Sequence, residues 1–258
     1  MSKFCESTYE EAFIQLLEEN GWEYTCGDDL HRKLDETILE DDLRDYLSRK
    51  YAAESLEDEE IGAIVANLRN TGDTSDYLTL RKVFSLYCGR GDGFVFKRFD
   101  GNDTALPIDY IYFETPENNT FRVVNQFTVT YKGGTKERRP DVLLFLNGIP
   151  VCIVELKNPA KVSATIEDAY DQIHIRYKRD IPHLMKYCAL SCISDASNTR
   201  LGTTYSEYIH YYAWKKVENE DPAANKGVPQ LETLIVSEDM LDAVEALGEA
   251  PFEVKIEP

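Results

Sequence analysis

The chain has 258 residues, of which 43% are hydrophobic, so it is long enough to bury a substantial core within one large domain. Its net charge of -19 at pH 7 argues against a general nucleic-acid-binding protein, which is normally basic, although local charge decides where phosphate is contacted. The sequence has no apolar run long enough to span a membrane, and residues 1–6 lack the apolar stretch of a signal peptide. We therefore expect a cytoplasmic protein with no membrane partner.

The six cysteines and four histidines give no sign of a disulfide framework or a zinc site. A long chain without a secretion signal usually keeps its thiols reduced. Cys188 and Cys192 are too far apart for a Cys-x-x-Cys pair, and Cys152 lies inside an apolar run that is typical of a small core residue.

The first 93 residues are predicted to be mostly helical. Residues 7–20 have the pattern of an amphipathic helix, and residues 22–24 start an extended segment. The charged helical pattern over residues 28–70 predicts two or three helices, and residues 77–87 predict another. This part is expected to form a helical N-terminal elaboration of the domain.

From residue 94 the hydrophobic period changes to that of strands. Asp141–Leu146 and Ile149–Leu156 are continuous apolar runs, as in strands buried on both faces, and Asn147-Gly148 between them is a strong hairpin signal. Residues 164–179 predict a helix that ends before Pro182. The other expected strands cover residues 94–96, 108–113, 121–130 and 187–193.

One group of residues in this hairpin carries a chemical signal: Asp141, then 13 residues, then Glu155-Leu156-Lys157. Because side chains alternate along a strand, Glu155 and Lys157 share a face, and the hairpin brings Asp141 alongside them. Glu-x-Lys pairs are also common on solvated strand edges. This pair, however, ends an apolar run, where a buried charge is costly unless it is paired or bound to a metal.

The register of the hairpin decides whether Asp141 can join the other two side chains. A simple two-residue turn at Asn147-Gly148 would pair Asp141 with Val154 and place it on the opposite face from Glu155. A three-residue loop with Gly148 in a left-handed conformation, or a bulge within a strand, restores a shared face. We predict one of these two arrangements.

These residue types predict a site for a hard divalent cation, normally Mg²⁺, with Mn²⁺ as a substitute. Asp141 and Glu155 would hold the cation, and the backbone carbonyl of Ile153 or Val154 would add a ligand. The cation would polarise a phosphate and lower the pKa of a bound water. Lys157 would position or deprotonate that water and offset the charge of the transition state.

Basic residues gather in two clusters that flank this group in the sequence, at residues 132–139 and 176–179. Each cluster either contacts phosphate or belongs to a solvated loop or helix face, and the sequence favours neither interpretation.

The stretch 139–159 resembles the nuclease core of the type I restriction enzyme R (motor and cleavage) subunit, a member of the PD-(D/E)xK superfamily. The aspartate, the Asn-Gly turn and the Glu-Leu-Lys triplet fall in the same order. The similarity extends to residues 6–24, 124–127, 169–177 and 214–215. It implies a restriction-endonuclease-like α/β fold, with a mixed central sheet flanked by helices.

The resemblance also implies roles for individual residues. Asp141, Glu155 and Lys157 would be the catalytic trio, and Glu10 would be an additional metal-binding carboxylate, unless it is only a capping or surface residue at a helix start.

The family carries a Gln-x-x-x-Tyr motif that supports the active site or holds DNA. Here Gln172 and Tyr177 are separated by one residue more, and five residues on an α-helix place two side chains about 140° apart. Either the helix bulges, or Arg176 takes the facing position, or the role is lost and both residues are helix surface.

The complete subunit of this family continues into an ATP-driven DNA translocase, whereas this sequence contains no GxxxxGK(S/T) phosphate loop. We therefore expect residues 1–258 to be the nuclease domain of a longer protein, with a core at 94–217 and an acidic tail at 218–258 that leads toward a motor. ATP would act only through that motor. Double-stranded DNA is the expected substrate, and modification and specificity subunits are the expected partners.

Two other functions are compatible with the same sequence. One is a catalytically silent assembly or DNA-binding module that keeps the fold. The other is a different PD-(D/E)xK nuclease, against which the match at the N-terminal helix argues.

Overall fold

The computed structural model describes residues 6–88, 93–99, 101, 104–131, 136–157, 165–195 and 198–213. The predictions for residues 214–215 and for the tail at 218–258 lie outside the described residues. All elements up to Tyr212 belong to one compact unit. No helix in the described part of the chain is long and apolar enough to cross a membrane.

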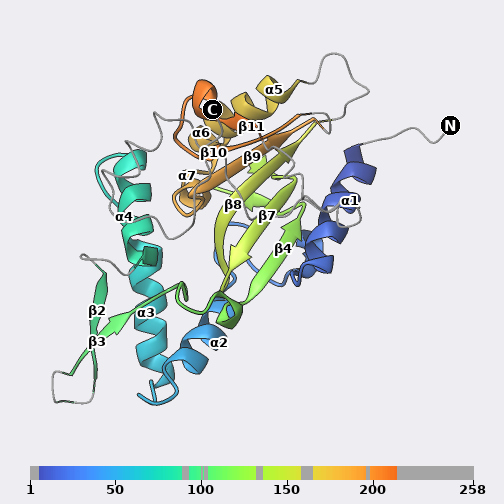
Figure 1. The fold of residues 1–258 in the computed structure, drawn as a ribbon. Coiled ribbons are helices and arrows are strands. Elements are labelled where there is room, and N and C mark those ends of the chain that lie inside the picture. The colour runs from blue at the N-terminus through green and yellow to red at the C-terminus, as the bar shows by residue number, and fades with distance from the viewer. Residues whose placement is uncertain are drawn as a thin grey trace, which may run out of the picture. The chain divides into compact units, whose positions relative to one another are not determined.

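A seven-stranded mixed sheet carries the hairpin at its centre (Figure 1). The β1–β4 and β8–β9 pairs are parallel, whereas the β4–β7, β7–β8 and β9–β10 pairs are antiparallel. In spatial order the strands are β1 (Glu23–Cys26), β4 (Phe121–Asn125), β7 (Val142–Leu146), β8 (Ile149–Leu156), β9 (Leu190–Ser194), β10 (Thr199–Thr203) and β11 (Tyr212–Ala213).

Helices cover both faces of this sheet, as the mixed α/β prediction requires (Figure 1). On one face, Ile14 of α1 (Glu6–Glu19) packs against Val154 and Leu156. On the other face, Ile153 packs against Ile173 in the helical segment that follows the hairpin. That segment consists of α5 (Ile166–Asp171), a π-helix (Gln172–Tyr177), α6 (Lys178–Asp180) and α7 (Pro182–Met185). Successive side chains along β8 point to opposite faces of the sheet. Glu155 and Lys157 therefore point to the same face as Ile153, which is the face that the π-helix covers.

The helical N-terminal part packs at the turn end of the hairpin. It contains α2 (Glu40–Lys50), α3 (Asp58–Asn70) and α4 (Asp76–Cys88), together with the ribbon of β2 (Phe94–Lys97) and β3 (Ala105–Ile108). Ile149 lies in its core. Glu60 on α3 is buried and pairs with Arg98 at 2.8 Å; hydrogen bonds from Arg98 lower the pKa of Glu60 to about 2.

Three predicted elements differ from the observed ones. Residues 108–113 are not a strand beyond Ile108, since β3 ends there. The strand predicted over 121–130 breaks at Gln126, which has φ +52°, and resumes as the short strand β5 (Val129–Thr130) paired with β6 (Glu137–Arg138). The helix predicted over 164–179 contains the π-helix, which periodicity alone does not reveal.

Candidate active site

The β7–β8 hairpin places Asp141 opposite Glu155 by means of a β-bulge. Its turn has two residues, Asn147 at φ +51° and Gly148 at φ +77°, which are the positive values that a tight hairpin turn of this kind needs. Leu146 therefore pairs with Ile149, but Val151 is an extra residue, because Phe145 faces Pro150 and Leu144 faces Cys152. Val142 then faces Val154, and the next pair in this register is Asp141 with Glu155.

This arrangement is the strand bulge predicted as one of two options, and the three-residue loop is absent from the hairpin. Asp141 is further fixed by the Leu156 amide, which donates to its Oδ2 at 2.8 Å. The backbone carbonyl of Asp141 accepts a hydrogen bond from the Gln126 amide at 2.9 Å. The side chain of Asp141 is therefore held by β8, and its backbone is held by the residue that follows β4.

Glu155 is almost completely buried, at 1% exposed, and its Oε2 atom has no hydrogen-bond partner among the described residues. Burial raises the pKa of Glu155 well above its usual range, and the charge of Asp141 raises it further, while Lys157 opposes the shift. A buried carboxylate oxygen without a partner costs free energy. A cation bound to this oxygen would remove that cost.

Lys157 and Glu155 are connected through the side-chain amide of Gln172. The Lys157 ammonium donates to Gln172 Oε1 at 2.9 Å and lies 3.5 Å from Glu155 Oε1, while Gln172 Nε2 donates to Glu155. An ammonium only donates and a carboxylate only accepts, so one orientation of the Gln172 amide satisfies both neighbours. Gln172 therefore fixes the positions of both groups.

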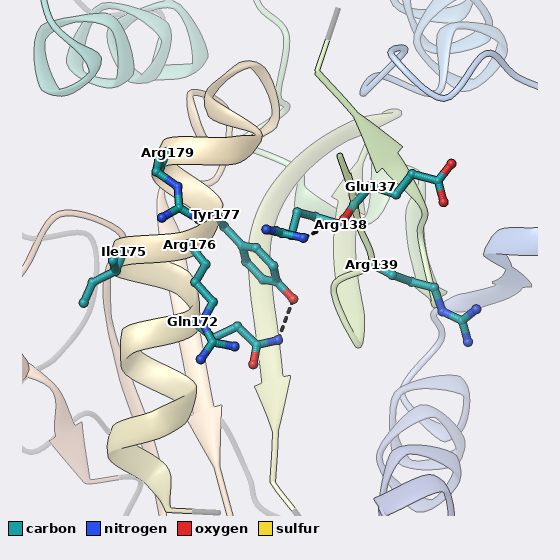
Figure 2. Close-up of a pocket in the computed structure, with 8 residues that line it drawn as sticks. All are labelled: Glu137, Arg138, Arg139, Gln172, Ile175, Arg176, Tyr177 and Arg179. Atoms are coloured by element: carbon teal, nitrogen blue, oxygen red, sulfur yellow. Dashed lines mark hydrogen bonds between the residues drawn. The ribbon is translucent and has the colours of Figure 1, made fainter. Parts of the chain in front are cut away.

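The π-helix brings Tyr177 to Gln172 despite the additional residue between them. The Lys178 amide donates to the Ile173 carbonyl five residues earlier, and this hydrogen bond defines the wider π turn. Residues five apart then share a face, and Gln172 Nε2 donates to Tyr177 Oη at 2.7 Å (Figure 2). Of the alternatives for this segment, the local bulge is the one observed. Burial, followed by the charge of Glu155, raises the pKa of the Tyr177 hydroxyl.

Glu10 lies beside this group, and among the described residues no hydrogen bond or ion pair joins it to Asp141 or Glu155, so its role as a metal ligand stays a prediction. Helix α1 covers the opposite face of the sheet, and Glu10 accepts hydrogen bonds from Asn125 and Gln126 at 2.8 Å each. The described residues contain no group of three or more histidine, cysteine, aspartate or glutamate side chains arranged to hold a metal. Burial raises the pKa of Glu10, the two amides lower it, and the charge of Asp141 raises it.

Asn125 and Gln126 are the polar residues of the site whose roles the sequence did not reveal. They end β4 directly beside Asp141, and Arg139 donates to the side chain of Gln126. A Cβ atom on Gly27 would lie 2.6 Å from the carbonyl oxygens of both, so only glycine allows the chain directly after β1 to run this close to them. The left-handed backbone of Gln126 has no signal in the sequence.

Two carboxylates and an unpartnered buried oxygen fit a hard divalent cation such as Mg²⁺, which prefers oxygen ligands and keeps several waters. Asp141 and Glu155 are the residues that would hold it. The carbonyls of Ile153 and Val154 were predicted as possible further ligands. Both residues pair with β7 on one side and β9 on the other, so their carbonyls face neighbouring strands instead.

The two basic clusters meet beside this group in a pocket of about 570 Å³ (Figure 2). Arg138 and Arg139 contribute from the segment around β6, and Arg176 and Arg179 contribute from the helical segment. Gln172 lines the pocket as well, so the pocket adjoins the group formed by Asp141, Glu155 and Lys157.

Comparison with known proteins gives a family match over most of the chain. A family model described as the type I restriction enzyme R protein N terminus matches residues 3–208. A protein of Methanocaldococcus jannaschii, named as an inferred type I restriction enzyme MjaIXP endonuclease subunit, is 30% identical over 220 residues. That match covers 82% of this chain and 20% of the relative.

The type I restriction enzyme HindI endonuclease subunit of Haemophilus influenzae is 28% identical over 252 residues, or 93% of this chain and 23% of the relative. The SsaAORF53P endonuclease subunit of Staphylococcus saprophyticus is 26% identical over 227 residues, or 83% of this chain and 21% of the relative. The chain thus spans about a fifth of the length of these relatives.

Proposed function

Since the chain belongs to the family of type I restriction enzyme R protein N termini, we propose that it is a Mg²⁺-dependent DNA endonuclease domain that hydrolyses phosphodiester bonds. The observation that carries the proposal is the buried Glu155 Oε2, which has no partner among the described residues and belongs to a carboxylate on which the charge of Asp141 acts. Lys157 and Gln172 complete the group. Mn²⁺ would substitute for Mg²⁺ at the same oxygen ligands.

When bound, Mg²⁺ would supply Lewis-acid activation of the scissile phosphate and of the attacking water. Asp141 and Glu155 would hold the cation from the two adjacent strands of the hairpin. Lys157 would position the attacking water, whose oxygen forms the new bond to phosphorus as its proton passes to solvent. It would also offset the negative charge that grows as the bond to the leaving oxygen breaks and that oxygen takes a proton from solvent.

Gln172 and Tyr177 keep this arrangement in place. Gln172 holds Lys157 through its oxygen and Glu155 through its nitrogen, so that the ammonium and the carboxylate stay near each other without a direct short ion pair. The buried Tyr177 hydroxyl accepts from the same nitrogen and packs beneath it. Both are positioning residues in this proposal.

The chain would act within a larger restriction complex. The relatives are named as endonuclease subunits and are about five times longer than the part matched. We propose that modification and specificity subunits supply the recognition of double-stranded DNA, and that ATP acts only through a motor region in the same subunit. The high negative charge of this chain agrees with a nuclease that depends on partners for most of its phosphate affinity.

A plasmid-cleavage assay tests the proposal. The wild-type chain should cleave supercoiled DNA with Mg²⁺ or Mn²⁺ but not with EDTA. Asp141→Ala, Glu155→Gln and Lys157→Ala should each reduce the rate by about 100-fold or more. The exposed residues Asp45 and Lys97 provide matched controls, and their alanine variants should cleave as the wild type does.

The alternative function, a silent assembly or DNA-binding module, gives a different result. Such a module would bind DNA without metal-dependent cleavage, and its three variants would behave like the wild type. That outcome would contradict the nuclease proposal.

A further inference from the structure

The arginine-lined pocket beside the catalytic group is the local exception in a chain of net charge -19. Four arginines line it, and they come from two segments that are 37 residues apart at their nearest members, Arg139 and Arg176. Only Glu137 among the lining residues is acidic. A pocket of this composition attracts an anion although the molecule as a whole repels one.

Asp180 fixes two of these arginines. Arg138 donates to it through Nε and Nη2, and Arg179 donates to its two carboxylate oxygens, so one buried carboxylate joins β6 to the end of the helical segment. The hydrogen bonds from Arg179 and then Arg138 hold the pKa of Asp180 well below its usual range. These two guanidinium groups are therefore held in place at the pocket by Asp180, whose carboxylate neutralises part of their positive charge.

Arg176 is placed differently. Its guanidinium makes no hydrogen bond or ion pair with any part of the chain that the structure describes, and its side chain is exposed. In Figure 2 it extends along the π-helix toward Gln172. Arg176 can therefore offer its donor fork to a ligand without giving up an existing partner. Arg139 extends to the other rim, where it donates to Gln126.

The lining suits a phosphate. A guanidinium fork matches a phosphate with two parallel hydrogen bonds. Ile175, which is 56% exposed, is the only aliphatic residue in the lining, and Tyr177 is the only aromatic one, so the pocket has few of the apolar walls that most small-molecule sites use. It adjoins Gln172, which contacts Glu155 and Lys157, so an extended phosphate chain can occupy the pocket and the catalytic group together.

We propose that this pocket binds a phosphodiester group that neighbours the scissile one on the same DNA strand. Arg176 is the principal ligand of that group. The inference rests on the proposed function and adds the subsite that aligns the strand. Arg138 and Arg179, held by Asp180, set the shape and potential of the pocket. Arg176 supplies the direct contact.

DNA binding by the 258-residue chain, measured in EDTA so that cleavage plays no part, tests this inference. The probe is a fluorescein-labelled 20-base-pair duplex, followed by anisotropy over a range of salt concentrations. Arg176→Ala should weaken binding by about 5- to 10-fold and lower the slope of log K against log salt by about one, as expected when one phosphate contact is lost. Arg176→Lys should keep the slope and recover part of the affinity.

The control is Arg81→Ala, because Arg81 is an exposed arginine on α4 outside the pocket. It should leave both affinity and slope unchanged. Inorganic phosphate and pyrophosphate serve as competitors, and full displacement of DNA by millimolar pyrophosphate would reassign the pocket to a free anion.

The outcomes separate the two proposals. If Arg176→Ala weakens DNA binding while the wild type does not cleave, the pocket inference holds and the nuclease proposal fails. If the wild type cleaves but Arg176→Ala binds and cleaves as the wild type does, the pocket inference is overturned alone. Absence of DNA binding by the wild type at low salt also overturns it.

Discussion

Gln172 and Tyr177 are five residues apart in the sequence, yet their side chains are hydrogen-bonded at 2.7 Å across a π turn. The same Gln172 amide reaches Glu155 and Lys157. The wider π turn thus accommodates the additional residue of this segment. The side chains of Gln172 and Tyr177 therefore still lie on the same face of the helix. π turns are rare and often lie at functional sites.

Deletion of Ile175 tests this explanation of the spacing. Ile175 is 56% exposed and lies inside the π turn, so its loss should convert the segment into a continuous α-helix with four-residue spacing between the glutamine and the tyrosine. We expect cleavage close to that of the wild type and a stability that is unchanged or raised by up to about 1 kcal/mol. Urea unfolding and the plasmid assay measure both.

Deletion of Asp45, an exposed residue within α2, is the matched control. No π turn is available there, so the deletion should rotate Tyr46 and Leu47 out of the core by about 100° and cost more than about 3 kcal/mol. Equal damage from the two deletions would refute the role assigned to the π-helix.

Glu155→Gln should stabilise the metal-free chain at neutral pH. The folded-state pKa of Glu155 is raised by burial and by Asp141, so ionisation of this carboxylate opposes folding. Below its ordinary pKa of 4.5 the group is protonated in both states, and the opposition grows as pH rises above that value. Thermal unfolding in EDTA should therefore show a gain of several degrees at pH 8 that fades toward pH 4.5.

Glu60→Gln should have the opposite effect on stability, although Glu60 is buried to a similar extent as Glu155. Its pKa is lowered to about 2 by Arg98, so its contribution to stability is complete above 4.5 and is lost as pH falls toward 2. This variant should lose about 3 kcal/mol at neutral pH, as for a broken buried ion pair, and less in acid. If both variants shifted stability in the same direction at pH 8, the account of Glu155 would be wrong.

Gly148→Ala should disrupt the hairpin that positions the site. Gly148 has φ +77°, and an added Cβ would lie 2.2 Å from the Leu39 carbonyl oxygen. Backbone cannot yield there, because the Leu39 amide donates to the Gly148 carbonyl at 2.9 Å. We expect a loss of about 3 kcal/mol or more in the free energy of unfolding. Gly72→Ala, with nothing within 4 Å of the new Cβ, is the control and should be tolerated.

The hairpin shows how far the sequence alone could lead. The Asn147-Gly148 turn and the spacing of Asp141 from Glu155 were sufficient to predict that a bulge or a longer loop must exist. They could not locate the bulge at Val151, because strand alternation is the same for both options. The position of the bulge depends on tertiary packing, because the side chain of Val151 packs against the core of the helical N-terminal part.

Glu10 and Asp180 show where sequence reasoning ends. The sequence does not say which face of the sheet α1 covers, and the structure places α1 on the face away from Glu155. The role of Glu10 as a metal ligand stays a prediction. The pairing of Asp180 with Arg138 joins residues 42 positions apart and depends on the tertiary fold. That Asp141, Glu155 and Lys157 lie together could be predicted from the sequence, whereas the geometry around them required the packing of both faces.

Isothermal titration with Mn²⁺ tests the central claim, that Asp141 and Glu155 hold one cation, most directly. The wild-type chain should bind one ion, Asp141→Asn and Glu155→Gln should abolish that binding, and Glu10→Gln should retain it because Glu10 lies on the other face of the sheet. A wild-type chain that binds no ion, or Asp141→Asn and Glu155→Gln variants that bind as the wild type does, would contradict it.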